Sequence, residues 1–312
     1  MPETLAQNSP RSGDADLARA ALAHAVARAN GDGLPRPEGR VYRADTLALE
    51  RSELRAHLDR ILLARHADFG LEALLATGVL GAVMPEVQAL VGLNDYEWRH
   101  KDVWRHTKQV VVQSVPRLPI RWAALLHDIG KPKTRRMEGA TVSFIGHPDA
   151  GARLFDRLER REKLFATDAD LRASIRFLVL YHQRASQYES DWTDSAVRRF
   201  ARELGAHLPE LLLLARADMT TKNRAKKRRM MYSIKELQDR IAVLAKEDAK
   251  VPPLPTGVGD AIMEAFGIPP SRLIGDIKRW LEEGVEVGEL PSQGPFEVYV
   301  EHLRRHRDRF GI

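Results

Sequence analysis

The stretch RWAALLHDIGKPKTRR, residues 121–136, decides the fold, because an apolar run in it ends in two adjacent ionisable residues. The run that closes at Leu126 is apolar all round, which is typical of a buried helix, and Gly130 contributes to the signal that ends the helix. His127 and Asp128 are therefore expected on the last turn of a core helix. Burying an unpaired polar group costs about 1–3 kcal/mol, and a charged carboxylate costs more. A divalent cation would compensate both side chains, but one helix cannot complete a site for it.

Other helical patches place a ligand-type side chain on an apolar stripe. In DVWRHTKQVVV either His106 or Thr107 falls on the stripe, and we place His106 inward. Taken alone, each such residue has a simpler interpretation, since a lone inward histidine is more often a hydrogen-bonded core residue and Asp218 could pair with Arg216. Several of them on separate helices favour a shared metal site. The further candidates are His182 after LRASIRFLVLY, Asp218 after PELLLLARA, and His147 in FIGHPDAGA, where a loop could turn into a helix.

The composition restricts the chemistry. The chain of 312 residues contains no cysteine, so disulfides and thiolate sites are excluded and a metal must be held by nitrogen and oxygen ligands. Its net charge of +6 favours anionic partners such as RNA or nucleotides without requiring them. No apolar run approaches the roughly 18 residues needed to cross a bilayer, and the N-terminal sequence lacks the pattern of a secretory signal. We expect a cytoplasmic protein with no membrane partner.

Helical periodicity interrupted by glycine and proline predicts an all-α fold. FGLEALLATGVLGAVMPEVQAL is expected to form two short helices split at Gly78, and VPPLP indicates a break before the last helices. We expect a mostly disordered or loosely ordered segment 1–46, a helical region 47–94, a helical bundle 95–250 that carries the candidate ligands, and a small helical region 251–312.

The order His, His-Asp, Asp on separate helices resembles the HD superfamily of metal-dependent phosphohydrolases, which are all-α bundles. The HDIGK stretch is similar to those of cyclic-dinucleotide phosphodiesterases and of the HD domains attached to tRNA nucleotidyltransferases, although the GYP signature of the former is missing. The resemblance implies one or two divalent ions, with Mn, Ni, Fe, Mg and Zn all open. It implies His106, His127, Asp128 and Asp218 as ligands of one ion, and His147 and His182 as ligands of a second ion that Asp128 bridges.

A closer resemblance runs from about residue 50 onward. The segment ERSELRAHLDRILLARHADFGLEALLATGVLGAVMPEV is similar to the neck of bacterial CCA-adding enzymes, HKDVWRHT and GHPDAGA to their HD domain, and the part after Pro252 to their tail. Only about 50 residues precede the neck-like region, and they lack the strand pattern of the catalytic head. The GDAD at residues 13–16 is best explained by chance, so we do not expect nucleotide addition.

The resemblance also suggests roles for the basic residues near the motif. Lys131 of the HDIGK stretch is expected to approach substrate phosphate and stabilise charge, unless it only complements the helix dipole. Arg135 is a further candidate for phosphate binding, together with His147 and His182 if they do not hold a second ion. Six basic side chains within residues 222–229 form either a solvated helix face or a surface that contacts nucleic-acid phosphates.

Three functions remain open on this basis. The first is a metal-dependent phosphohydrolase, with Asp128 and Lys131 as its catalytic residues, that acts on 2′,3′-cyclic phosphates, 2′-phosphates or related nucleotide and RNA ends, tRNA 3′ ends among them. The second is a non-catalytic protein that binds tRNA or another RNA. The third is a hydrolase of a cyclic dinucleotide or nucleotide signal that uses the same site.

Overall fold

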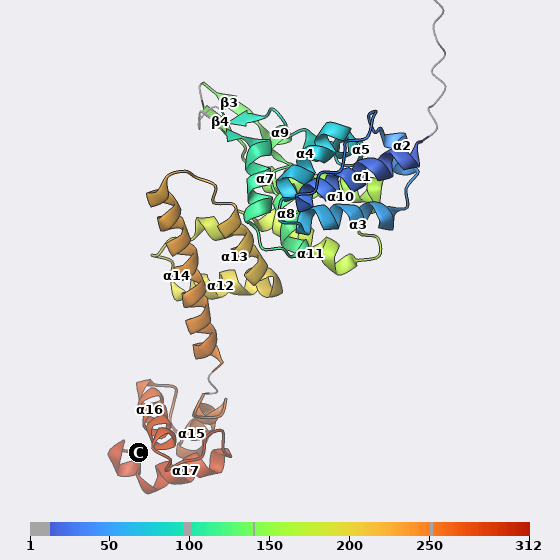
Figure 1. The fold of residues 1–312 in the computed structure, drawn as a ribbon. Coiled ribbons are helices and arrows are strands. Elements are labelled where there is room, and N and C mark those ends of the chain that lie inside the picture. Colours follow the sequence, from blue (N-terminus) through green and yellow to red (C-terminus); the bar gives the residue numbers. More distant parts are fainter. Residues whose placement is uncertain (1–12, 96–100, 140, 250–251) are drawn as a thin grey trace, which may run out of the picture. The chain divides into compact units, whose positions relative to one another are not determined.

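The computed structural model describes residues 13–95, 101–139, 141–249 and 252–312 (Figure 1). Nearly all regular structure in these residues is helical, which confirms the predicted all-α fold. Within the same residues, no helix is both long enough and apolar enough to cross a lipid bilayer. The strands described form two antiparallel hairpins, which pair β1 (Asn94–Asp95) with β2 (Lys101–Asp102) and β3 (Arg136–Glu138) with β4 (Thr141–Ser143).

Helix α1 (Ala15–Asn30) lies in the segment 1–46, for which we expected loose order. Residues 1–12 of that segment lie outside the described residues. The helix begins after Asp14, whose side chain accepts a hydrogen bond from the amide of Leu17, so one carboxylate of the GDAD sequence serves as a helix cap. The expectation of loose order is therefore wrong for Ala15–Asn30, which form a regular helix.

Helix α1 packs against α4 (Ala67–Thr77) through a face rich in buried alanine. A Cβ atom on Gly70 of α4 would lie only 2.7 Å from the Cβ of Ala29, so small side chains on both helices allow the close approach. Alanine produces only weak apolar periodicity, which is why the sequence placed this helix within a segment expected to be loosely ordered. The other helices of this part are α2 (Arg43–Leu47), α3 (Arg51–Leu63), α5 (Val79–Val83), which follows the predicted break at Gly78, and α6 (Pro85–Gln88).

Helix α8 (Leu118–Leu126) is the central element among the helices that precede α14, and it contacts α3, α7, α11 and α13. All its residues from Ile120 to Leu126 are buried, as expected for a core helix, and the one charged side chain among them, Arg121, donates to the Leu62 carbonyl at 3.0 Å. The polar edge of Trp122 is satisfied, because its Nε1 donates to Asp59 Oδ1 of α3 at 2.6 Å. The other helices of this part of the chain are α7 (Val103–Gln113), α9 (Lys131–Thr134), α10 (His147–Glu162), α11 (Ala169–Tyr181), η2 (Arg184–Gln187), α12 (Asp194–Leu204), η3 (Gly205–His207), α13 (Leu208–Ala217) and α14 (Arg224–Asp248).

A buried carboxylate ties the end of α10 to α2 and α3. The side chain of Glu162 is fully buried and forms ion pairs with Arg43, with Arg51 at 3.3 Å, and with Arg161 at 2.8 Å. A buried charge of this kind is tolerated only when it is paired, so the three guanidinium groups are what allow α10 to end here.

The chain divides into two compact units between Ile241 and Ala242, within α14. The first unit therefore contains the region 47–94 and most of the region 95–250, and the division lies before the Pro-rich break that we expected to separate the last helices. The second unit has a core of its own, in which Ile277, Leu281 and Tyr299 are buried. Its helices are α15 (Val258–Phe266), α16 (Arg272–Glu286), α17 (Phe296–Arg305) and η4 (Arg307–Arg309).

Candidate metal centre

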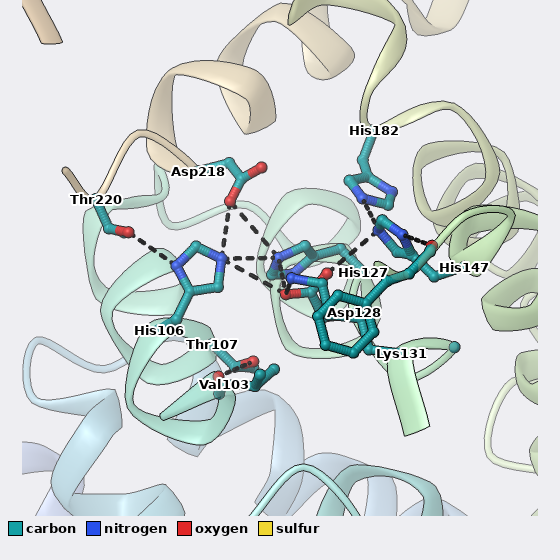
Figure 2. Close-up of polar contacts among 12 residues, drawn as sticks. Val103, His106, Thr107, His127, Asp128, Lys131, His147, His182, Asp218 and Thr220 are labelled. Atoms are coloured by element: carbon teal, nitrogen blue, oxygen red, sulfur yellow. Dashed lines mark hydrogen bonds and ion pairs between the residues drawn. The ribbon is translucent and has the colours of Figure 1, made fainter. Parts of the chain in front are cut away.

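The six candidate ligands meet at one place in the first unit, although they come from five helices (Figure 2). Most of them lie at helix ends, where a side chain can leave the helix surface and reach a shared point. His127, His182 and Asp218 are the C-terminal cap residues of α8, α11 and α13, and His147 is the first residue of α10. His106 alone projects from the middle of a helix, α7.

The first of two ligand clusters contains His106, His127 and Asp218. The Nε2 atom of His106 lies 3.0 Å from Asp218 Oδ1 and 3.3 Å from the Nε2 atom of His127. His127 is 1% exposed, whereas the side chains of His106 and Asp218 retain 13% and 32% exposure. This cluster is therefore open to solvent on the side of α7 and α13.

The second cluster contains Asp128, His147 and His182, all of which are buried. The Nε2 atoms of the two histidines lie 3.1 Å apart, and His147 Nε2 lies 3.4 Å from Asp128 Oδ1. In each cluster the possible ligand atoms lie within 4.8 Å of one another. Both groups thus have the size and the donor types of a metal site.

Asp128 lies between the two clusters, as Figure 2 shows. Its Oδ1 faces His147 in the second cluster, whereas its Oδ2 lies 3.2 Å from His127 Nε2 and 3.6 Å from His106 Nε2 in the first. One carboxylate thus offers an oxygen to each cluster. This is the geometry expected of the bridging ligand that the resemblance implies.

Three of the four histidines are held by the same backbone contact. His127, His147 and His182 each direct Nδ1 at the carbonyl oxygen three residues earlier, at 2.9, 2.9 and 2.8 Å. A carbonyl oxygen can only accept a hydrogen bond, so Nδ1 must carry the proton and the lone pair of a neutral ring lies on Nε2. All three rings therefore direct Nε2, which can bind a metal when it carries no proton, at the clusters.

The charge state of the second cluster indicates that a cation fits there. Burial lowers the pKa of His182 to about 4 and also lowers the pKa of His147, so both rings are neutral near pH 7. Their Nε2 atoms then face each other 3.1 Å apart with no proton between them, which is unfavourable unless a positive charge lies close to both. Neutral imidazole with carboxylate is a donor set that suits first-row divalent ions.

The first cluster is held by charge as well. Burial alone would lower the pKa of His127, but the carboxylates of Asp128 and Asp218 outweigh it and raise the pKa to about 9. Burial would likewise raise the pKa of Asp218, yet the hydrogen bond from His106 and the charge of His127 keep it below its ordinary value. The pKa of Asp128 is lowered against its burial by His127 and Lys131. Both carboxylates are therefore ionised and able to bind a cation.

Comparison with known proteins identifies this arrangement. Residues 103–223 match the HD domain family. The chain contains an HD domain. All six candidate ligands lie within the matched residues, and the resemblance noted in the sequence is confirmed.

Over a longer stretch the chain is similar to tRNA nucleotidyltransferases. It is 31% identical over 258 residues to the A-adding tRNA nucleotidyltransferase of Deinococcus radiodurans, which covers 80% of this chain and 57% of that protein. It is 28% identical over 265 residues to the CC-adding tRNA nucleotidyltransferase of Thermus thermophilus, which covers 83% of this chain and 58% of that protein. The Multifunctional CCA protein of Pseudomonas paraeruginosa is 32% identical over 160 residues. The chain spans somewhat more than half the length of the first two relatives.

The sequence analysis also considered four residues outside the two clusters, and their positions differ from one another. Lys131 Nζ donates to Asp128 Oδ2 at 2.8 Å, so its charge is directed at the ligands rather than only at a helix end. Arg135 is exposed. Thr107 is fully buried and donates to the Val103 carbonyl, which leaves His106 as the residue of this stripe that faces the centre. Arg216 bonds to Gln238 instead of Asp218.

One functional contact was not predicted from the sequence. The Oγ1 atom of Thr220 lies 2.8 Å from Nδ1 of His106 and orients that ring. This hydroxyl replaces the backbone carbonyl that holds the other three histidines. Thr220 follows the end of α13, where helical periodicity no longer applies, and its position two residues after Asp218 was the only available signal.

A cavity of about 780 Å³ opens beside His106 in the HD domain. It lies between the outer face of α7 and the turn that precedes α14, and its lining side chains are mostly polar or charged, with the carboxylates of Asp68 and Asp102 beside the basic groups. Such a cavity has the volume of a typical small-molecule site. The lining residues include His106, Arg105, Gln109, Thr220, Lys222 and Asn223.

Proposed function

We propose that the protein is a metal-dependent phosphohydrolase that acts on 2′,3′-cyclic phosphates, 2′-phosphates or related nucleotide and RNA ends. The observation that carries the proposal is the position of Asp128, which offers one carboxylate oxygen to each of two ligand clusters. The HD domain supports metal-dependent hydrolysis, and the names of the relatives support a substrate that is related to tRNA. Nucleotide addition by those relatives is not carried over.

We assign His106, His127, Asp128 and Asp218 to one ion, and Asp128, His147 and His182 to a second ion or to substrate phosphate. When bound, divalent ions at such a site supply an activated water nucleophile and neutralise charge on the phosphoryl group. The protein's own residues orient the reaction. The hydrogen bonds that Nδ1 donates to backbone carbonyl oxygens fix the direction of three rings, and the burial of Asp128 limits access to its oxygens.

Lys131 and the cavity beside His106 complete the proposed site. The ammonium group of Lys131 lies 2.8 Å from Asp128 Oδ2, close enough to stabilise negative charge that develops on a phosphoryl oxygen. The cavity is open to solvent and borders the more exposed cluster, so the nucleotide would enter from this side. Thr220 and Asn223 line it with groups that can hydrogen-bond to ribose or base.

The proposal is tested by incubating the purified protein with Mn²⁺, Ni²⁺ or Mg²⁺ and a panel of phosphoesters that includes adenosine 2′,3′-cyclic monophosphate, a nucleoside 2′-phosphate and a cyclic dinucleotide. We expect hydrolysis of the first two, its loss in Asp128→Ala, and its retention in Asp170→Ala. Asp170 is an exposed carboxylate in the first turn of α11 and is a matched control for the loss of negative charge.

Two results would contradict the proposal. If wild type and Asp128→Ala are equally inert on every phosphoester while both bind tRNA, a non-catalytic RNA-binding function replaces it. If only the cyclic dinucleotide is hydrolysed, the site is catalytic but acts on a signalling nucleotide.

A further inference from the structure

The first two turns of α14 carry a dense group of positive charges next to the proposed active site. We call the part of the chain from Lys222 to Tyr232 the α14 basic segment. Its Lys222, Arg224, Arg228 and Arg229 are exposed. A charge run is often only a solvated helix face, so further observations must distinguish the two interpretations.

The first such observation is that these charges are not neutralised by the protein. Farther along the same helix, Lys235 is paired with Asp239. By contrast, Lys222, Arg224, Arg228 and Arg229 form no ion pair with any carboxylate among the residues that the structure describes. Exposed basic residues on a solvated helix commonly pair with acidic residues three or four positions away. Because these four side chains form no such ion pairs within the described residues, their positive charge is available to an anionic partner.

The second observation is an exposed aromatic ring within the charged surface. Tyr232 is 69% exposed and lies one helical turn after Arg228. The two side chains border a hollow of about 560 Å³ on one side, together with Arg229 and Ser190, and a hollow of about 640 Å³ on the other, together with Lys235. An aromatic ring between basic side chains is the arrangement with which proteins stack unpaired bases while they contact the phosphates.

The third observation is that the basic segment begins at the proposed active site. Lys222 lines the cavity that also contains His106, and Thr220 just before it bonds to that histidine. From Arg224 to Tyr232 the helix rises by about 12 Å at 1.5 Å per residue. That length corresponds to roughly four nucleotides of a stacked strand at about 3.4 Å each, so a mononucleotide in the cavity cannot reach Tyr232.

The carboxylates fix the far end of this surface. Glu236 lines the first hollow and Asp239 the second, and both follow Tyr232 along the helix. Phosphates are therefore expected on the part of the helix that precedes Tyr232, between this ring and the active site.

We propose that the α14 basic segment binds single-stranded RNA, with a base stacked on Tyr232 and the 3′ end directed into the cavity beside His106. This inference deepens the proposed function and rests on it for the direction of the strand: it selects an RNA end, rather than a free nucleotide, as the substrate. Binding itself does not require hydrolysis and is measured separately.

Binding is tested by fluorescence anisotropy with a 5′-labelled ten-nucleotide single-stranded RNA that ends in a 3′-hydroxyl. We expect Tyr232→Ala to raise the Kd about fivefold or more, and Tyr232→Phe, which keeps the ring, to bind like wild type. Arg228→Ala should reduce the slope of log Kd against log salt by about 0.7, the contribution of one phosphate contact on a single strand. Arg160→Ala, which removes an exposed charge from α10, should leave both quantities unchanged.

The inference is overturned if Tyr232→Ala binds the RNA like wild type, or if a duplex of the same sequence binds equally well, since a paired base cannot stack on the ring. Tyr232 is exposed, and a thermal unfolding curve that matches wild type excludes misfolding of the variant.

A kinetic measurement separates this inference from the proposed function. For RNA that ends in a 2′,3′-cyclic phosphate, Tyr232→Ala should raise KM, whereas KM for adenosine 2′,3′-cyclic monophosphate should not change. RNA binding that depends on Tyr232 in a protein without hydrolytic activity would uphold the RNA surface and refute the hydrolase. Hydrolysis with the same KM in wild type and variant on both substrates would uphold the hydrolase and refute the RNA surface.

Discussion

Replacement of Gly130 by alanine should disrupt the second ligand cluster, because Gly130 is where α10 touches the turn after α8. A Cβ atom at this position would lie 2.0 Å from the carbonyl oxygen of His147 and 2.7 Å from the amide nitrogen of Gly151. Both are backbone atoms, so no side-chain rotation can relieve the overlap. The start of α10, and His147 with it, must move.

The size of the movement follows from the contact distances. Real Cβ contacts are not shorter than about 3.0 Å, so the 2.0 Å contact with the His147 carbonyl must lengthen by at least 1.0 Å. Metal–ligand distances vary by only about 0.2 Å within functional sites, so such a shift would remove His147 from a shared ion. Overpacking of a dense core typically costs about 1–3 kcal/mol, and we expect Gly130→Ala at the upper end of this range.

Two other glycines provide a graded comparison. A Cβ on Gly151 would meet the Val179 Cγ1 atom at 3.2 Å, which a side chain can relieve by a few tenths of an ångström, so Gly151→Ala should have a small effect. A Cβ on Gly33 would meet nothing within 4 Å, so Gly33→Ala should be neutral. Thermal unfolding without metal measures the loss of stability, and calorimetric titration with Mn²⁺ measures how many ions bind.

The reasoning is refuted if Gly130→Ala unfolds at the wild-type temperature and binds as many ions as wild type. It is also refuted if the three variants do not follow the order of their contact distances, since the argument depends on that order alone.

Three further predictions concern residues that support the site or the fold. Thr220→Ala should weaken Mn²⁺ binding in a calorimetric titration by about 10- to 100-fold, because His106 loses the contact that orients its ring, whereas Thr220→Ser should restore it. Glu162→Ala should lower the free energy of unfolding in urea by about 3 kcal/mol, because three guanidinium groups lose their shared buried carboxylate. Burial outweighs the hydrogen bonds from Phe165 and raises the folded-state pKa of Glu159 above its ordinary value of 4.5. The folded state therefore keeps this proton to a higher pH than the unfolded state does, and the wild-type protein loses stability as the pH rises from 4.5 to the raised pKa. Glutamine cannot ionise, so the stability of Glu159→Gln relative to wild type should increase over the same pH range. Urea unfolding of both proteins at the two ends of this range measures the difference.

The sequence was sufficient to predict which six side chains gather at one place, because most of their positions follow from helical periodicity. His127 and His182 each continue an apolar stripe to a helix end, and the structure places both within a few ångströms of their expected partners. Periodicity alone could not choose between His106 and Thr107. Adjacent helix positions lie about 100° apart, so each of the two residues can lie at one edge of the same broad apolar stripe. The structure resolves this choice, because Thr107 bonds to its own helix and His106 faces the ligands.

What the sequence did not reveal depends on partners that lie far away in the chain. Helix α1 is stabilised by the fit of its alanines against Gly70, and neither side chain type gives a strong apolar signal by itself. Thr220 acts across 114 positions on His106, outside any regular helix. The two hollows beside Tyr232 likewise appear only when α14 is packed. Local pattern thus predicts which residues point inward, and tertiary packing decides what they meet.

Removal of metal should not unfold the helices around the site, because the ligands are positioned by the protein itself. Three rings are fixed by backbone carbonyl oxygens three residues earlier in the chain, and α8, whose C-terminal cap is His127, is buried from Ile120 to Leu126. The far-ultraviolet circular dichroism spectrum should therefore be the same with a chelator and with Mn²⁺. The ion should nevertheless raise the unfolding temperature, since a ligand present at 100 times its Kd stabilises the folded state by about 2.7 kcal/mol. A loss of helical signal on chelation would show that the ion organises the site, and would contradict the preformed arrangement.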